Sequence, residues 1–151
     1  MNKNELSYII QNKYNKKSEE NNLDELNINP ALYIFLLDQS YSMIGNAMKL
    51  AIKALILFMQ SLPQGSYYQI IGFGFEYIKY DETPKEYSQE NIEKSIAFTE
   101  TLTANLGGTD IFSPLNDIYS SYEIYDKIKL PKNIFLLTDG YITNKKNFGN
   151  D

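Results

Sequence analysis

Two continuous apolar runs in distant parts of the chain constrain its fold most strongly. The first, Ala31–Leu37, leads directly into Asp38, and the second, Ile134–Leu137, leads into Thr138 and Asp139. Strands that are apolar without alternation are typical of a parallel sheet covered by helices on both faces. Because ligands bind beyond the carboxyl ends of such strands, Asp38 and Asp139 are expected to face one crevice.

The segments around these runs indicate the order strand, helix, strand, strand, helix, helix, strand. Strands are expected at 31–37, 67–75, 76–80 and 131–138, helices at 43–62, 88–103 and 113–127, and loops at 81–86 and 105–110. Ser88 is the expected N-cap of its helix, and Gly72 and Gly74 indicate close approach of another backbone. The predicted fold class is α/β, with a doubly wound, mostly parallel sheet that stops after the fourth strand.

Composition excludes several kinds of site. The 151 residues contain no His and no Cys, and the rows show no Arg, so that all 14 basic residues are Lys. Without imidazole and thiolate there is no zinc finger, disulfide, Ser-His-Asp triad or Cys nucleophile. Any metal must then be a hard ion held by oxygen. The net charge of −5 and the missing Arg argue against a nucleic-acid partner.

Residues 1–29 form a polar N-terminal extension, rich in Asn, Lys and Glu. Within it, apolar residues from Leu6 to Tyr14 lie near helical spacing. Met1–Glu20 has no apolar run of signal-peptide length, and no stretch approaches the roughly 20 apolar residues of a membrane span. We therefore expect an intracellular, cytoplasmic protein with no transmembrane segment.

The residues after the apolar runs carry the candidate chemistry. Asp38, Ser40 and Ser42 place three oxygen side chains in one tight loop before a helix, and Thr109 lies in the Gly-rich loop before Asp110. Mg²⁺ prefers near-octahedral oxygen coordination and keeps several waters. Each motif alone fits an ordinary cap or turn, but the three together, with Asp139, favour a metal site.

With these motifs, the segment from about Ala31 to Asn144 resembles von Willebrand factor A domains, also called integrin I-like domains. The resemblance rests on Asp38–Met43, Gly107–Asp110 and Phe135–Gly140. The segments Ala51–Pro63 and Ile70–Gly74 are most similar to the intracellular branch of that family. Residues 30–151 would then be a partial domain of this kind.

The resemblance implies a metal-ion-dependent adhesion site for Mg²⁺ or Mn²⁺. Ser40 and Ser42 would bind the ion directly, Thr109 directly or through water, and Asp38 and Asp139 would supply charge, often through water. The open position would take a carboxylate from a protein partner. The implied function is a non-enzymatic protein–protein interaction module, a subunit of a larger assembly.

Two departures from the family pattern matter. Tyr41 stands where the family usually has Gly, and only Tyr141–Asp151 follows the last strand, where the family continues with two more parallel strands. The strand at 131–138 would therefore have an open edge, a liability that proteins normally cover. Three accounts are open: the chain is a fragment of a longer protein, residues 1–29 cover the edge, or a partner chain completes the sheet.

Two other functions compete with the metal-dependent module. The chain would be a structural assembly subunit with a vestigial metal site if a partner covers the open edge and the ion is unused. A Mg²⁺-dependent phosphoryl-transfer enzyme would use Asp38 as the nucleophile. The haloacid-dehalogenase pattern needs a second Asp at the position of Ser40, which disfavours the enzyme.

Overall fold

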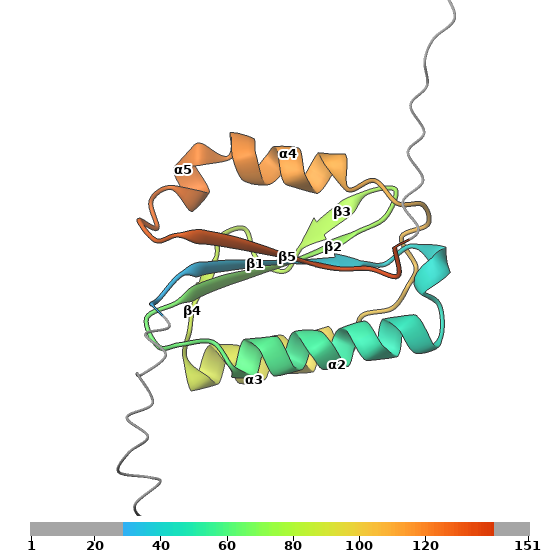
Figure 1. Cartoon of the computed structure of the whole chain (residues 1–151), viewed down its shortest axis with the longest axis horizontal. Helices are drawn as coiled ribbons and strands as arrows, with labels where there is room; N and C mark the ends of the chain where they lie inside the picture. Colours follow the sequence, from blue (N-terminus) through green and yellow to red (C-terminus); the bar gives the residue numbers. More distant parts are fainter. Residues whose placement is uncertain (1–28, 141–151) are drawn as a thin grey trace, which may run out of the picture.

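The computed structural model describes residues 29–140. Within them a sheet has the strand order β3-β2-β1-β5, with β4 also paired to β2 (Figure 1). The elements are β1 (Leu32–Asp38), the 3-10 helix η1 (Tyr41–Met43), α2 (Asn46–Gln60), β2 (Tyr67–Phe73), β3 (Tyr77–Lys79), β4 (Lys85–Glu86), α3 (Gln89–Thr99), α4 (Phe112–Ser120), α5 (Tyr122–Tyr125) and β5 (Lys132–Leu137). β1 pairs in parallel with β2 and β5, whereas β3 and β4 run antiparallel to β2. The predicted α/β fold with a mostly parallel sheet is confirmed.

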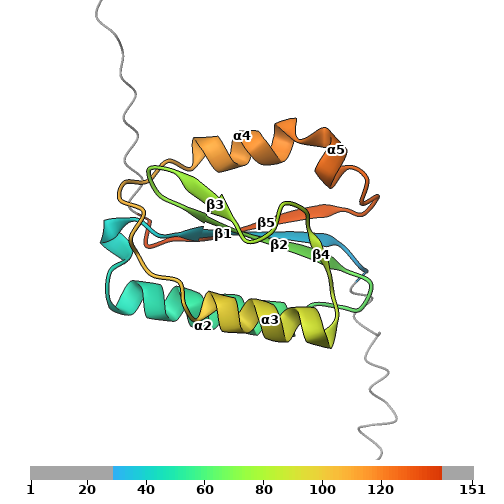
Figure 2. The same cartoon turned by 180° about the vertical axis from the view of Figure 1, so that it is seen from behind.

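Helices cover both faces of the sheet, α2 and α3 on one and α4 and α5 on the other (Figures 1 and 2). The central strand β1 therefore buries both of its faces. Phe35 and Leu37 belong to the core beneath α2 and α3, and Leu32, Ile34 and Leu36 belong to the core beneath α4 and α5. All five are fully buried, which explains why this strand is apolar without alternation.

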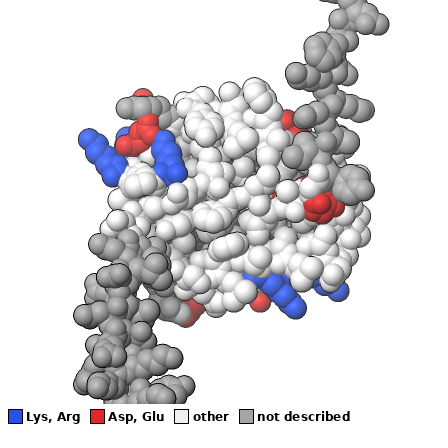
Figure 3. All heavy atoms as spheres, in the orientation of Figure 1, with Lys and Arg blue, Asp and Glu red and all other residues white. Residues whose placement is uncertain are grey.

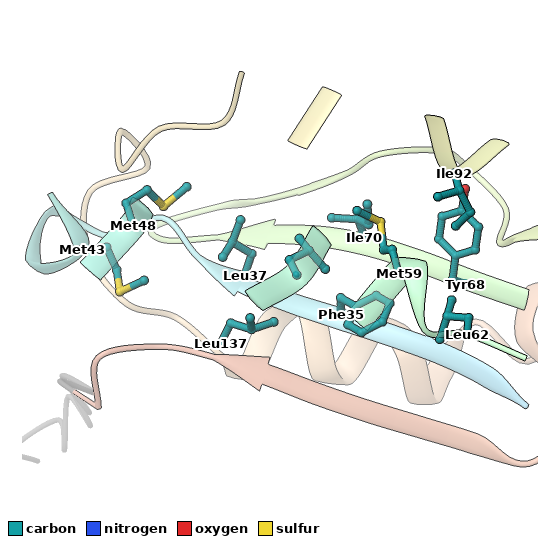
Figure 4. Packing of buried hydrophobic residues seen from close by; sticks show 11 residues of the cluster. Phe35, Leu37, Met43, Met48, Met59, Leu62, Tyr68, Ile70, Ile92 and Leu137 are labelled. Atoms are coloured by element: carbon teal, nitrogen blue, oxygen red, sulfur yellow. The ribbon is translucent and has the colours of Figure 1, made fainter. Parts of the chain in front are cut away.

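The start of the long helix differs from the prediction. A helix was expected from Met43, but η1 ends there and α2 begins at Asn46, after Gly45 with φ of +93°. That left-handed conformation, which favours glycine, separates the two helices. Met43 still packs into the core with Met48 and Met59 (Figure 4), whereas Ile44, inside the helix expected at 43–62, is 65% exposed.

Other boundaries differ by a few residues. The helix expected at 113–127 is two helices, because Ser121 has a non-helical ψ of 55° between α4 and α5. The loop expected at 81–86 contains the short strand β4. Ser88 is the N-cap of α3, since its Oγ accepts a hydrogen bond of 3.2 Å from the Asn91 N–H. No helix within residues 29–140 is long and apolar enough to cross a membrane.

The last strand, β5, lies at the open end of the described sheet, as predicted. It pairs with β1 in register, Ile134 beside Ile34 and Leu137 beside Leu37. Although the two strands are similarly apolar, Leu136 is 42% exposed whereas Leu36 is fully buried. The polar extension and Tyr141–Asp151, including the account in which residues 1–29 cover this edge, lie outside the described residues.

Candidate metal centre

The end of β1 carries a buried carboxylate. Asp38 is fully buried, and its Oδ1 accepts a hydrogen bond of 2.8 Å from the Ser40 N–H. Its Oδ2 accepts a hydrogen bond of 2.7 Å from the Thr138 hydroxyl, which comes from the end of β5. None of the ion pairs recorded among residues 29–140 includes Asp38. A buried carboxylate without a positive partner is costly, so its remaining lone pairs favour a cation.

Serine hydroxyls link Asp38 to the second carboxylate. The Ser40 and Ser42 Oγ atoms are hydrogen bonded at 2.9 Å, and the Ser42 hydroxyl donates to Asp139 Oδ1 at 3.3 Å. Asp139 and Ser42 are exposed, whereas Ser40 is buried. The structure therefore brings four of the five predicted ligands together in one polar cluster that begins beneath the surface and opens to solvent.

The Gly-rich loop that contains Thr109 lies against the first loop. The Leu106 N–H donates to the Gln39 carbonyl at 2.9 Å, and the Tyr41 N–H donates to the Gly107 carbonyl at 2.8 Å. This loop runs past the carboxyl ends of the strands, near η1 (Figure 2). Thr109, the fifth predicted ligand, is half-buried in this loop, two residues from the Gly107 contact.

Asp110, next to Thr109, binds the first turn of α4 and is not one of the predicted metal ligands. Its Oδ1 accepts hydrogen bonds from the Phe112 N–H at 2.9 Å and the Ser113 N–H at 3.2 Å, and its Oδ2 accepts one from the Ser113 hydroxyl. These bonds, that of the Ser113 hydroxyl above all, lower the pKa of Asp110. Asp110 therefore caps the first turn of α4.

The donor set fits a hard cation. Within residues 29–140 no three or more His, Cys, Asp or Glu side chains gather around one point, so an ion here would depend on two carboxylates together with hydroxyls and water. Oxygen donors of this kind suit Mg²⁺. The segments 38–45, 74–76, 104–111 and 138–140 contain Asp38, Glu76, Asp110 and Asp139 but no Lys. The negative charge of these four segments favours a cation.

Sequence reasoning missed one residue of the cluster. Thr138 donates to Asp38 across the sheet, and its own Oγ1 accepts a hydrogen bond of 3.1 Å from the Gly140 N–H. Its position directly between an apolar strand and Asp139 was the available signal. Tyr41, which stands where the family usually has Gly, is 63% exposed.

Comparison with known proteins now identifies the family. A model of the von Willebrand factor type A domain matches residues 33–148. The chain belongs to the von Willebrand factor A (vWA) domain family. A vWA domain-containing protein of Dictyostelium discoideum is 37% identical over 113 residues, which are 75% of this chain and 12% of that protein. Mouse von Willebrand factor A domain-containing protein 5A is 36% identical over 121 residues, covering 74% of this chain and 15% of that protein.

Solved structures support the same fold. A von Willebrand factor type A structure from Catenulispora acidiphila matches with a TM-score of 0.58 at 16% identity, covering 70% of this chain and 25% of that chain. The N-terminal part of the pilus tip protein Mfa5 from Porphyromonas gingivalis matches with a TM-score of 0.54 at 19% identity, over 71% of this chain and 19% of that one. This vWA chain therefore spans only a small part of the length of these relatives.

Proposed function

We propose that this vWA domain is a non-enzymatic protein–protein interaction module that binds its partner through Mg²⁺ or Mn²⁺. The ion would be held by Asp38, Ser40, Ser42, Thr109 and Asp139. The observation that supports this most strongly is a pair of hydrogen-bonded connections between the two strand ends. One runs from Thr138 to Asp38, and the other runs from Ser40 through Ser42 to Asp139. Hydroxyl and carboxylate oxygens therefore connect the end of β1 to the end of β5.

Charge explains why the partner would contribute a carboxylate. The described segments 38–45, 74–76, 104–111 and 138–140 contain acidic residues and no Lys, so their charge disfavours an acidic partner as long as no cation is present. Two carboxylates near a divalent ion leave little excess positive charge, and a third, from the partner, completes the site at modest cost. Binding of the partner would then depend on the ion.

Calorimetric titration with MgCl₂ and MnCl₂ tests this function. Asp139→Asn is the informative variant because Asp139 is exposed, so the fold should survive the loss of its charge. We expect saturable binding to the wild type and an affinity lower by about tenfold or more in the variant. Glu123→Gln, which removes an exposed carboxylate of α5, should bind like the wild type. Absence of binding to the folded wild type would contradict the proposal.

Among the described residues β5 pairs only with β1, so its other edge is a candidate second contact for the same partner. A groove of about 450 Å³ between α2 and β5 is lined by apolar residues including Leu50, Phe58 and Leu136, and it reaches Thr138 and Asp139. The surface over α2 and β5 is uncharged at its centre (Figure 3). We propose that an extended partner segment pairs with β5, places apolar side chains in this groove and directs its acidic residue to the metal.

The exposed apolar edge also favours a second candidate, a structural assembly subunit that does not use its metal. In that case the chain purified alone should self-associate through β5, and Leu136→Lys should restore a monomer because charged residues block strand pairing at edges. Ser40→Ala combined with Ser42→Ala should leave the assembly unchanged. Native mass spectrometry that finds a well-folded monomeric wild type would count against this candidate.

We also propose an intracellular location, which the absence of Cys and of Asn-x-Ser/Thr sequons supports. The sequence similarity to protein 5A extends over 74% of this chain, which makes that relative the natural reference for localisation. Fractionation of cells that express the tagged chain tests the location. Recovery in the secreted fraction would contradict it.

A further inference from the structure

Phe75, two residues beyond the end of β2, is an exposed aromatic residue that contacts the Gly-rich loop. Its side chain is 78% exposed, yet its ring lies against both glycines of the Gly-rich loop. A Cβ atom on Gly107 would come within 2.2 Å of Phe75 Cδ2, and one on Gly108 within 2.4 Å of Phe75 Cε1. The ring therefore occupies the space that side chains at these two positions would need.

The backbone around Phe75 joins the same loop to β2. The Phe75 N–H donates to the Leu106 carbonyl at 2.7 Å, and the Asp110 N–H donates to the Gly74 carbonyl at 2.7 Å. Gly74 must lack a side chain, since a Cβ there would lie 2.4 Å from the Leu106 carbonyl oxygen. Together with the bonds from Leu106 and Tyr41 to the first loop, these contacts attach the Gly-rich loop to the ends of both β1 and β2.

Ordering the two adjacent glycines costs backbone entropy, and contact with the Phe75 ring reduces this cost. Gly107 has φ of +82°, a conformation that glycine adopts readily, but adjacent glycines lose more backbone entropy on ordering than other residues. A ring in contact with both glycine positions restricts that freedom. The position of Thr109, one residue further along, depends on the same loop conformation.

We propose that Phe75 is a positioning residue for the candidate metal centre: its ring holds Gly107 and Gly108, and thereby keeps Thr109 next to the Ser40 loop. This inference rests on the proposed function for its effect on metal binding. The effect on the loop itself requires no metal. The two parts are therefore measured separately.

Hydrogen exchange of the metal-free chain gives the first measurement. In Phe75→Ala we expect faster exchange of the amides of Leu106, Tyr41 and Asp110, with an unchanged midpoint of global unfolding because the ring is mostly exposed. Phe75→Tyr, which keeps the ring, should exchange like the wild type. Phe112→Ala is the matched control: Phe112 is 74% exposed and follows the same loop, but its ring is not among the atoms nearest to either glycine position.

Titration with MgCl₂ gives the second measurement. We expect Phe75→Ala to weaken Mg²⁺ binding about tenfold, the fold-change that corresponds to losing the order of roughly one residue, and Phe75→Tyr to restore it. Wild-type exchange rates in Phe75→Ala would overturn the inference. A Phe75→Ala variant whose loop amides exchange faster but whose Mg²⁺ affinity is unchanged would also overturn it. Failure of the wild type to bind Mg²⁺ overturns the proposed function instead, while the exchange data still decide whether the ring holds the loop.

Discussion

Replacing Thr138 by Val tests the link between β1 and β5. The Thr138 hydroxyl donates to the fully buried Asp38 at 2.7 Å, and Val keeps the shape of the side chain but cannot donate. A hydrogen bond to a charged group contributes about 1.5–3 kcal/mol, and leaving a buried acceptor unsatisfied adds to the loss. We therefore expect Thr138→Val to lower the free energy of unfolding by about 2 kcal/mol, measured by urea denaturation in chelator.

Three comparisons make this prediction specific. Thr138→Ser retains the hydroxyl and should lose less than about 1 kcal/mol. In the Asp38→Asn background the same Thr138→Val change should cost less, because the charge is gone, and the difference gives the coupling energy. Saturating Mg²⁺ should restore part of the lost stability, since an ion that binds only the folded state stabilises it. A change below about 0.5 kcal/mol in Thr138→Val would refute the claim that the hydroxyl stabilises the buried carboxylate.

Two further predictions concern the opposite face of the sheet, where Lys79 of β3 pairs with Asp117 of α4 at 2.6 Å and both side chains are largely buried. Lys79→Met should lower the free energy of unfolding by about 3 kcal/mol, because it leaves the Asp117 charge buried beside Tyr77 and Tyr125. Combining Lys79→Met with Asp117→Leu should recover most of this loss. Equal stabilities of the wild type and Lys79→Met in urea melts would contradict this prediction. Burial, together with the Asp117 charge, raises the pKa of Tyr125, so the stability that depends on its neutral form is present below pH of about 10 and is lost as the pH rises further. Tyr125→Phe should reduce this alkaline loss and, since the buried hydroxyl has no hydrogen-bond partner among the described residues, should cost little at neutral pH; an unchanged alkaline profile would count against this explanation.

The parallel strands β1 and β5 could be predicted from their continuous apolar composition, although β1 is buried on both faces and Leu136 of β5 is exposed. Ile34–Leu37 and Ile134–Leu137 are apolar without alternation, and parallel pairing of β1 with β5 brings Asp38 and Asp139 to one end of the sheet. The close backbone approach predicted at Gly72 and Gly74 is confirmed at Gly74, which lies against the Leu106 backbone, whereas Gly72 lies against the Gln39 side chain.

The features that could not be predicted depend on a single backbone conformation, on a very short strand or on a contact between distant segments. The break before α2 rests on the positive φ of Gly45, and a single glycine in an apolar pattern does not distinguish a helix interior from its boundary. β4 spans only Lys85–Glu86, too short for a pattern. The contact of Phe75 with Gly107 joins residues far apart in sequence, and the sequence pattern placed Phe75 at the end of the predicted strand 67–75.

The location of the ion tests the central proposal most directly. Crystals of the chain grown with MnCl₂ and measured at a wavelength where manganese scatters anomalously would reveal the ion's position. We expect one anomalous peak between Asp38 and Asp139, within bonding distance of the Ser40 and Ser42 Oγ atoms. A saturated crystal without a peak in this crevice, or with manganese bound only elsewhere, would contradict the metal-dependent interaction module.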